Sequence, residues 1–400
     1  MSLISSSLTI LLFWGTLILY GISSLWWVFQ VTVLSRGWGS DDDELVGLEK
    51  VQVRILNVAA EDTVQVTTNT IPKSVAEVHV IAEEAINIDG ATVHVVPDEF
   101  ECAAQRKGRA IEWARKNISC EQEYVLYLDE DSLLTNLEGL PPGDIIQITE
   151  HPLRTGSLLT YLCEIFRVGF QFEQRAFHRF GYPTYAWGGA VAVRHELENQ
   201  VTWDVPTITE DTTFIWRAAD QTELDYRLVD AKVRNQAPPT LMDMFKQRRR
   251  WISGTMLDLH LLPRRYKPVI LTRIITWTLS PVVPFLAVIT YFYPGLAPAS
   301  TLYLGLSIAL FAIVFLYMIL GLIEYRKYPE VWPLYLLATP LAVLLHSLGA
   351  FWGIIRPATD FEVTAKTAKV KTKEVERLNP ELSEGEIESH SGTDSLRGDS

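Results

Sequence analysis

The stretch YVLYLDED, residues 124–131, predicts how this chain folds, because five strand-favouring residues run directly into an acid–x–acid triplet. A short, continuous apolar run is typical of a buried strand in a parallel sheet. Ligands of such sheets bind just beyond the carboxyl ends of the strands. We therefore expect Asp129 and Asp131 to project together at the edge of a nucleotide-sized crevice.

Two carboxylates in this position suit a hard divalent cation. Mg²⁺ and Mn²⁺ prefer oxygen ligands and often bridge to phosphate oxygens. Asp129 and Asp131 therefore predict a Mg²⁺ or Mn²⁺ site. The alternative is a solvated acidic turn after the strand, because acid–x–acid triplets are common, and the triplet alone does not decide between the two.

The segments around this stretch alternate between strand-like and helix-like patterns. AAQRKGRAIEWARKN (103–117) is an amphipathic helix pattern between two segments rich in Val and Ile. Such alternation implies an α/β fold with a mostly parallel sheet. Strands are expected at VQVRILNV (51–58), AEVHVIA (76–82), ATVHVV (91–96), EYVLYL (123–128) and GDIIQIT (143–149).

Apolar segments lie on both sides of this polar domain. Residues 8–34 carry no charge and exceed the about 20 apolar residues that cross a bilayer. No Lys or Arg precedes them, which favours a membrane anchor over a cleaved signal. Segments 268–293, 300–324 and 331–355 are also long enough to span.

The basic residues next to these segments predict an orientation. Lys and Arg precede 268–293 and follow 331–355, and an excess of positive charge marks the cytoplasmic side of a cell membrane. Residues 51–260 and the C-terminal tail are therefore both expected in the cytoplasm. Three complete spans between them would put them on opposite sides. We therefore expect 268–293 or 331–355 to lie in the interface or to re-enter.

The overall composition argues against a nucleic-acid partner, a disulfide framework and a zinc site. The net charge of −13 argues against nucleic acid as a partner. The three cysteines, Cys102, Cys120 and Cys163, are widely spaced and predict neither a disulfide framework nor a zinc site.

Thr209-Glu210-Asp211 opens a predicted helix, TEDTTFIWRAA. Carboxylates in a first turn commonly satisfy free N–H groups and the helix dipole. The functional alternative makes Asp211 a general base that deprotonates an acceptor hydroxyl. An unperturbed Asp is ionised at neutral pH, and burial would raise its basicity.

QRRRW, residues 247–251, lies on a predicted helix that begins after Pro239. Gln247, Arg250 and Trp251 share one helical face and would suit a diphosphate and an acceptor sugar. A juxtamembrane basic cluster attracted to lipid head groups is the alternative, and we favour it for Arg248 and Arg249.

Three further features are weaker signals. Gly188 and Gly189, in YAWGGA, either let the backbone approach a ligand closely or form an ordinary turn. Lys107 either reaches phosphates or is a solvated helix charge. Glu83 ends the second predicted strand and could face a nucleotide base.

Taken together, LDED, TED, QRRRW, the apolar spans and FEVTAKT (361–367) resemble the membrane-bound inverting glycosyltransferases of family 2, which include cellulose and hyaluronan synthases. VIAEEAINIDGATVHVVPDEF (80–100) with KGRA is most similar to the Egghead-type β-1,4-mannosyltransferases. The resemblance covers residues 50–370. It implies a GT-A-like fold that binds a nucleotide sugar.

The resemblance also implies roles for individual residues. Asp131 would bind the metal, and Asp129 would contact the nucleotide and, directly or indirectly, the metal. Asp211 would be the catalytic base, with Glu210 beside it. The remaining implied residues are Glu83, Lys107 and Arg250 for the donor, Gln247, Arg250, Trp251, Gly188 and Gly189 for the acceptor and diphosphate, and Phe361, Val363 and Thr364 for gating.

These inferences predict a membrane-bound, metal-assisted transferase that moves a sugar from a UDP- or GDP-sugar to a lipid-linked glycan or a growing polysaccharide. The alternatives are a processive polysaccharide synthase with export, a catalytically silent nucleotide-binding scaffold, and a transporter with a soluble domain. The predicted order is an anchor (1–34), an acidic linker (35–50), a cytoplasmic catalytic domain (51–260), a membrane region (261–356), a gating segment (357–375) and a disordered acidic tail (376–400).

Overall fold

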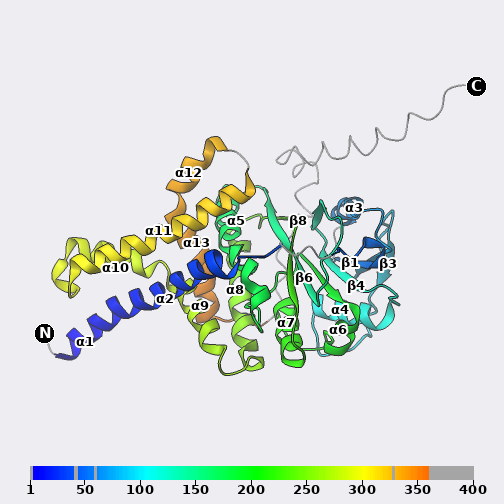
Figure 1. Cartoon of the computed structure of the whole chain (residues 1–400), viewed down its shortest axis with the longest axis horizontal. Coiled ribbons are helices and arrows are strands. Elements are labelled where there is room, and N and C mark those ends of the chain that lie inside the picture. Colours follow the sequence, from blue (N-terminus) through cyan, green and yellow to red (C-terminus); the bar gives the residue numbers. More distant parts are fainter. Residues whose placement is uncertain (1–2, 40–43, 58–60, 327–328, 360–400) are drawn as a thin grey trace, which may run out of the picture.

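The computed structural model describes residues 3–39, 44–57, 61–326 and 329–359 (Figure 1). A sheet-containing domain lies on one side and a group of long helices on the other. The predicted gating residues and the acidic tail lie outside the described residues.

An eight-stranded sheet in the order β3-β2-β1-β4-β7-β6-β8-β5 forms the centre of the domain. The first four strands in this order are parallel, and β7 runs antiparallel to both β4 and β6. β8 runs parallel to β6 and antiparallel to β5. The predicted mostly parallel α/β sheet is therefore confirmed. The strands are β1 Val51–Asn57, β2 Glu77–Ala82, β3 Thr92–Val95, β4 Tyr124–Asp129, β5 Leu133–Thr135, β6 Ile145–Leu153, β7 Ala190–Arg194 and β8 Tyr226–Gln236.

The stretch that predicted the fold is the buried strand β4. Its side chains alternate between two cores, as the period of two in a strand requires. Val125 and Tyr127 pack in one core, and Leu126 and Leu128 pack in the core on the other face. Burial on both faces explains why the stretch reads as one continuous apolar run.

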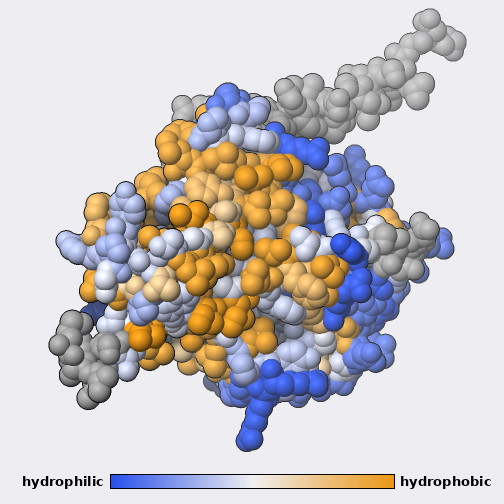
Figure 2. Space-filling model, turned by 60° about the vertical axis from the view of Figure 1, so that its left-hand side comes forward, coloured by the Kyte–Doolittle hydropathy of each residue, from blue (hydrophilic) through white to orange (hydrophobic). Residues whose placement is uncertain are grey.

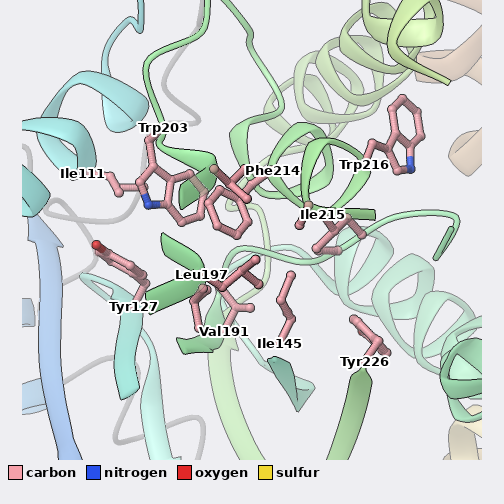
Figure 3. Close-up of a cluster of buried hydrophobic side chains, with 14 of the residues drawn as sticks. Ile111, Tyr127, Ile145, Val191, Leu197, Trp203, Phe214, Ile215, Trp216 and Tyr226 are labelled. Atoms are coloured by element: carbon pink, nitrogen blue, oxygen red, sulfur yellow. The ribbon is translucent and has the colours of Figure 1, made fainter. Parts of the chain in front are cut away.

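The helices of the domain cover both faces of the sheet. α4, α6 and α7 contribute to the core in Figure 3, where Trp203 stacks on Phe214 at a ring-centroid distance of 4.0 Å. α3 packs on the opposite face through Val64. The helices of this half are α3 Glu61–Asn69, α4 Lys107–Asn117, α5 Leu158–Phe170, α6 His195–Val201, α7 Glu210–Gln221 and α8 Leu241–Asp258.

The other half consists of apolar helices. Its surface is mostly hydrophobic, whereas hydrophilic side chains gather over the sheet-containing part (Figure 2). Helical residues Ser7–Leu34 and α11 are each long and apolar enough to cross a membrane. The helices are α1 Leu3–Ile10, α2 Thr16–Phe29, α9 Lys267–Leu279, α10 Val282–Phe292, α11 Ser300–Tyr325, α12 Trp332–Leu337 and α13 Thr339–Ile355.

Two apolar pairs of helices are sharply bent. α9 and α10 meet at 53°, and Pro329–Leu337 meets α13 at 65°. These bent pairs correspond to segments 268–293 and 331–355. The sequence predicted that one of these two segments lies in the interface or re-enters the membrane. A bend of this kind fits either a broken span or a re-entrant loop.

Glycines let the apolar helices pack directly against the domain. A side chain on Gly169 of α5 or on Gly321 of α11 would collide with the backbone of the other helix. Gly349 and Gly353 of α13 lie in the same way against the backbone of α8. The helix that carries QRRRW is therefore held against a helix of the apolar half.

Candidate active site

A single cavity of about 680 Å³ joins the residues that the sequence singled out. It begins where β4 and β6 end and extends between the apolar helices. Every predicted site residue that the structure describes lines it: Glu83, Lys107, Asp129, Asp131, Gly188, Gly189, Glu210, Asp211, Gln247, Arg250 and Trp251. Phe361, Val363 and Thr364, predicted to gate the site, lie outside the described residues.

Lys107, the first residue of α4, is the centre of a carboxylate cluster in this cavity. Its Nζ lies 3.2 Å from Asp129 Oδ1, 3.4 Å from Glu210 Oε1 and 3.4 Å from Asp211 Oδ2. It also donates to the carbonyl oxygen of Gly188 at 3.2 Å. The side chain is 13% exposed, so it is not the solvated helix charge that was the alternative. One ammonium thus links the acid at the end of β4 to the acids at the start of α7.

The cluster alters the proton affinity of its members. Burial, opposed by Lys107 and assisted by Glu210 and Asp129, raises the pKa of Asp211 to about 7. Burial lowers the pKa of Lys107, but the three carboxylates together raise it above its ordinary value. At neutral pH Lys107 is therefore charged, and Asp211 is poised to accept a proton.

Asp129 and Asp131 present carboxylate oxygens suited to Mg²⁺ or Mn²⁺. Asp131 is buried, and its Oδ2 accepts from the backbone N–H of Gln236 on β8 at 3.1 Å. Beside it, the buried Oδ1 of Asn235 has no hydrogen-bond partner among the described residues. Within that same part of the chain, no group of three or more His, Cys, Asp or Glu could hold a metal alone. Mg²⁺ commonly takes one or two carboxylates and completes its shell with substrate phosphates, so these residues fit a cation that binds together with a diphosphate.

QRRRW lies on α8, as predicted. The hydroxyl of Thr240 caps the helix by accepting from the N–H of Asp243 at 3.2 Å. Gln247, Arg250 and Trp251 all line the cavity, as their i, i+3 and i+4 spacing requires. An amide, a guanidinium and an indole therefore face the same space.

The prediction that Arg248 belongs to an exposed basic cluster is wrong. Arg248 is fully buried, pairs with Glu164 of α5 and donates its Nε–H to His346 of α13 at 3.2 Å. A buried charge needs such a partner, and Glu164 supplies it from an otherwise apolar helix. Arg249 is only half-buried and donates to the carbonyl oxygen of Arg356 at 2.7 Å.

Two buried side chains of β6 fix the loop that carries the paired glycines. The amide of Gln147 accepts from the N–H of Trp187 at 2.9 Å and donates to its carbonyl oxygen at 2.9 Å. The carboxylate of Glu150 accepts from the N–H of Gly189 at 3.0 Å. These bonds hold the loop by its backbone, which leaves the indole of Trp187 at the cavity.

Arg167 was not predicted as a site residue, yet it lies beneath two indoles of the cavity. Its guanidinium carbon is 4.1 Å from the ring centroid of Trp187 and 5.9 Å from that of Trp251. It pairs with Glu150 at 3.4 Å and with Glu164. Such stacking holds the two flat rings in place at the cavity. The sequence offered one signal for this group, namely Glu150, a carboxylate that directly follows the predicted strand 143–149. Nothing in the apolar pattern of α5 marks Arg167 as a site residue.

Gly188→Ala tests whether the loop must lie against the acidic cluster. A methyl group at this position would meet the carboxylate of Asp211 and the ammonium of Lys107. We expect kcat to fall by about tenfold or more, because a small displacement of reacting groups is costly. Thermal unfolding of the same variant should change little, since the collision is with side chains at a cavity. Wild-type kcat would contradict the close approach.

Comparisons with known proteins identify the family of this chain. The family model described as "Glycosyl transferase family group 2" matches residues 124–325. Beta-1,4-mannosyltransferase egh of Drosophila melanogaster is 23% identical over 331 residues, which are 73% of this chain and 71% of that protein. Beta-1,4-mannosyltransferase bre-3 of Caenorhabditis elegans is 26% identical over 208 residues, 45% of each chain.

Among solved structures, mannosyltransferase PcManGT from Pyrobaculum calidifontis, in complex with GDP-Man and Mn²⁺, aligns with 86% of this chain and 98% of that chain. The TM-score is 0.43 and the identity is 13%. The family match, by contrast, covers half of the chain, from the start of β4 to the end of α11. The chain therefore belongs to glycosyl transferase family group 2 and is a nucleotide-sugar-dependent glycosyltransferase.

Proposed function

We propose that this protein is an integral membrane glycosyltransferase that moves a hexose from a UDP- or GDP-sugar to a hydroxyl of a lipid-linked glycan or growing polysaccharide, with inversion at the anomeric carbon. The observation that carries the proposal is the contact of one ammonium, that of Lys107, with both Asp129 and Asp211. This contact brings Asp129, a carboxylate of the proposed diphosphate side, next to Asp211, the candidate base, in one cavity. The relatives are named mannosyltransferases, so mannose is the first sugar to test.

A single displacement accounts for the proposed reaction. Asp211 takes the proton of the acceptor hydroxyl while the hydroxyl oxygen bonds to the anomeric carbon. The bond from that carbon to the diphosphate oxygen breaks, and its electron pair leaves with the diphosphate. No covalent bond to the enzyme forms, so one displacement inverts the centre. Glu210, buried beside the base, shapes the acceptor side of the cavity.

Positive charge at the donor end would stabilise the leaving group. Arg250 and Lys107 both line the cavity, and fixed charges in a site with little water stabilise developing negative charge strongly. Mg²⁺ or Mn²⁺, held by Asp131 and Asp129, would add Lewis-acid stabilisation of the diphosphate. Glu83 follows β2 at the exposed end of the cavity, where a nucleotide base would lie.

The membrane assignment rests on the apolar half of the molecule. Ser7–Leu34 and α11 have the length and composition of membrane spans. The basic residues around 264–267 and at 356 favour a cytoplasmic catalytic domain. A membrane-bound acceptor would then meet the cavity close to the bilayer.

The pH dependence of kcat/KM should report the base. Only ionised Asp211 can take a proton, and its pKa is raised to about 7. We therefore expect kcat/KM to rise with pH up to about 7 and to level off above it. A profile that is flat between about pH 5 and 8 would mean that a different group acts as base.

Nucleotide release tests the proposal as a whole. Purified protein in detergent is incubated with a panel of UDP- and GDP-sugars, Mn²⁺ or Mg²⁺, and a membrane lipid extract. We expect one donor to release nucleotide in the presence of metal only. Metal-dependent binding of nucleotide without release from any donor would contradict the proposal and favour a silent scaffold.

A further inference from the structure

The lining of the cavity includes exposed side chains at two places of different chemistry, which we call its two mouths. At the domain end, the lining side chains that reach the surface are those of Glu83 and Arg106, close to the acids of β4. This mouth is polar and charged, as the entrance for a nucleotide sugar should be. Donor and product can exchange with water here.

The second mouth lies between α2 and α9. Its lining side chains that reach the surface are apolar: Ile22 and Trp26 of α2 are 59% and 42% exposed, and Val269 of α9 is 42% exposed. They belong to the apolar half of the molecule, whose hydrophobic surface is shown in Figure 2. Exposed apolar side chains around an opening mark it as a contact with hydrocarbon rather than with water.

An arm of the same cavity runs inward from this second mouth. Phe166 and Phe170 of α5, Tyr317 of α11 and Val343 of α13 contribute to its lining. These residues come from helices of both halves of the molecule. The arm is therefore part of the packed structure and is continuous with the space in front of Asp211.

Polar side chains also line this part of the cavity, and several of them are paired within the protein. Ser23 of α2 accepts from the hydroxyl of Thr276 of α9 at 3.0 Å, which joins the two helices beside the mouth. Arg273 of α9 pairs with Glu173, so its charge is neutralised within the protein. The buried Nε1–H of Trp277 lines the cavity and has no acceptor among the described residues. The arm thus offers hydrophobic contacts from its aromatic and aliphatic side chains, and the paired polar groups between them add little net charge.

We propose that the α2–α9 mouth is a lateral membrane entrance for the acceptor. The acceptor is an amphiphile whose hydrocarbon chain occupies the arm while its hydroxyl-bearing head group reaches Asp211. This inference rests on the proposed function and assigns one end of its cavity to the lipid part of the acceptor. A lipid that enters sideways keeps its chain in an apolar environment throughout, so it need not be extracted into water.

Filling the arm tests the inference. Ser23→Trp places an indole at the α2–α9 mouth, and Leu25→Trp adds the same group on the 63% exposed face of α2, outside the cavity lining. Each variant receives a labelled nucleotide sugar and a membrane lipid extract, and the label in the organic phase is counted. We expect Ser23→Trp to lower the organic-phase product at least tenfold per bound nucleotide, and Leu25→Trp to match wild type.

Two further variants separate the effect of added side-chain volume at the mouth from the effect of losing the Ser23–Thr276 hydrogen bond. Ser23→Ala removes the bond to Thr276 without adding volume and should keep most of the organic-phase product. Val269→Trp fills the mouth from the α9 side at an exposed position, where extra bulk is tolerated by the fold, and should lower the product as Ser23→Trp does. Nucleotide binding, measured in parallel, reports whether the donor end has kept its structure.

The outcomes distinguish failure of the lateral entrance from failure of the proposed function. Wild-type levels of organic-phase product in both Ser23→Trp and Val269→Trp, or label that wild type transfers only to water-soluble material, would overturn the lateral entrance while leaving the glycosyltransferase intact. Absence of nucleotide release from wild type with every donor would instead overturn the proposed function itself.

Discussion

We expect Asp211→Asn to lower kcat for sugar transfer by about 10²–10⁴-fold, the usual contribution of general-base catalysis. The amide keeps the size of the side chain but cannot take the proton of the acceptor hydroxyl. Donor binding should change by only a few-fold, because Lys107 keeps its contacts with Asp129 and Glu210. Initial rates of nucleotide release at saturating donor, together with donor affinity, measure the two effects separately.

A control on the same helix makes this result specific. Asp220 is an exposed residue near the end of α7 and accepts from the hydroxyl of Tyr182 at 3.1 Å. Asp220→Asn should therefore leave kcat unchanged. If Asp211→Asn retained more than about a tenth of wild-type kcat, proton transfer would not depend on this residue, and the assignment of the base would be wrong.

The second large effect is expected at the metal. Asp131→Asn should reduce kcat/KM for the donor by about 100-fold or more, because a bound cation contributes several kcal/mol to stabilising the charge on a leaving diphosphate. The amide is a weaker ligand and carries no charge. In titrations with Mn²⁺, the variant should need far more metal for half-maximal activity than wild type does.

The control for this experiment is an acid outside the cavity. Asp89, which follows β2 on the exposed surface, keeps its backbone bond to Gln65 when its side chain is altered. Asp89→Asn should show the wild-type metal titration. An unchanged Mn²⁺ requirement in Asp131→Asn would exclude this carboxylate as a ligand and direct attention to Asp129.

Much of the fold was predictable because buried strands leave a strong pattern. β4 is covered on both faces, so its sequence is apolar without interruption and its end is marked by acids. β8 was not predicted, although it pairs with both β5 and β6. Its sequence YRLVDAKVRNQ is mixed because most of its side chains are only half-buried. A strand of this kind has no clear apolar alternation to detect.

The residues that meet in the cavity were predictable from the sequence, but their contacts were less so. The acids at 129, 131 and 211 are marked by the elements that they end or begin. Nothing in the sequence shows that Lys107 contacts both Asp129 and Asp211, because Asp211 lies more than 100 residues away along the chain. Arg248 reads as one of three adjacent arginines, and only tertiary packing decides that it is the buried one.

The anomeric configuration of the product tests the central claim most directly. With the donor identified by nucleotide release, ¹H NMR of the first product gives the configuration of the transferred sugar against that of the donor. A single displacement with Asp211 as base predicts complete inversion. A product with the configuration of the donor would require a covalent or otherwise two-step path and would contradict the account.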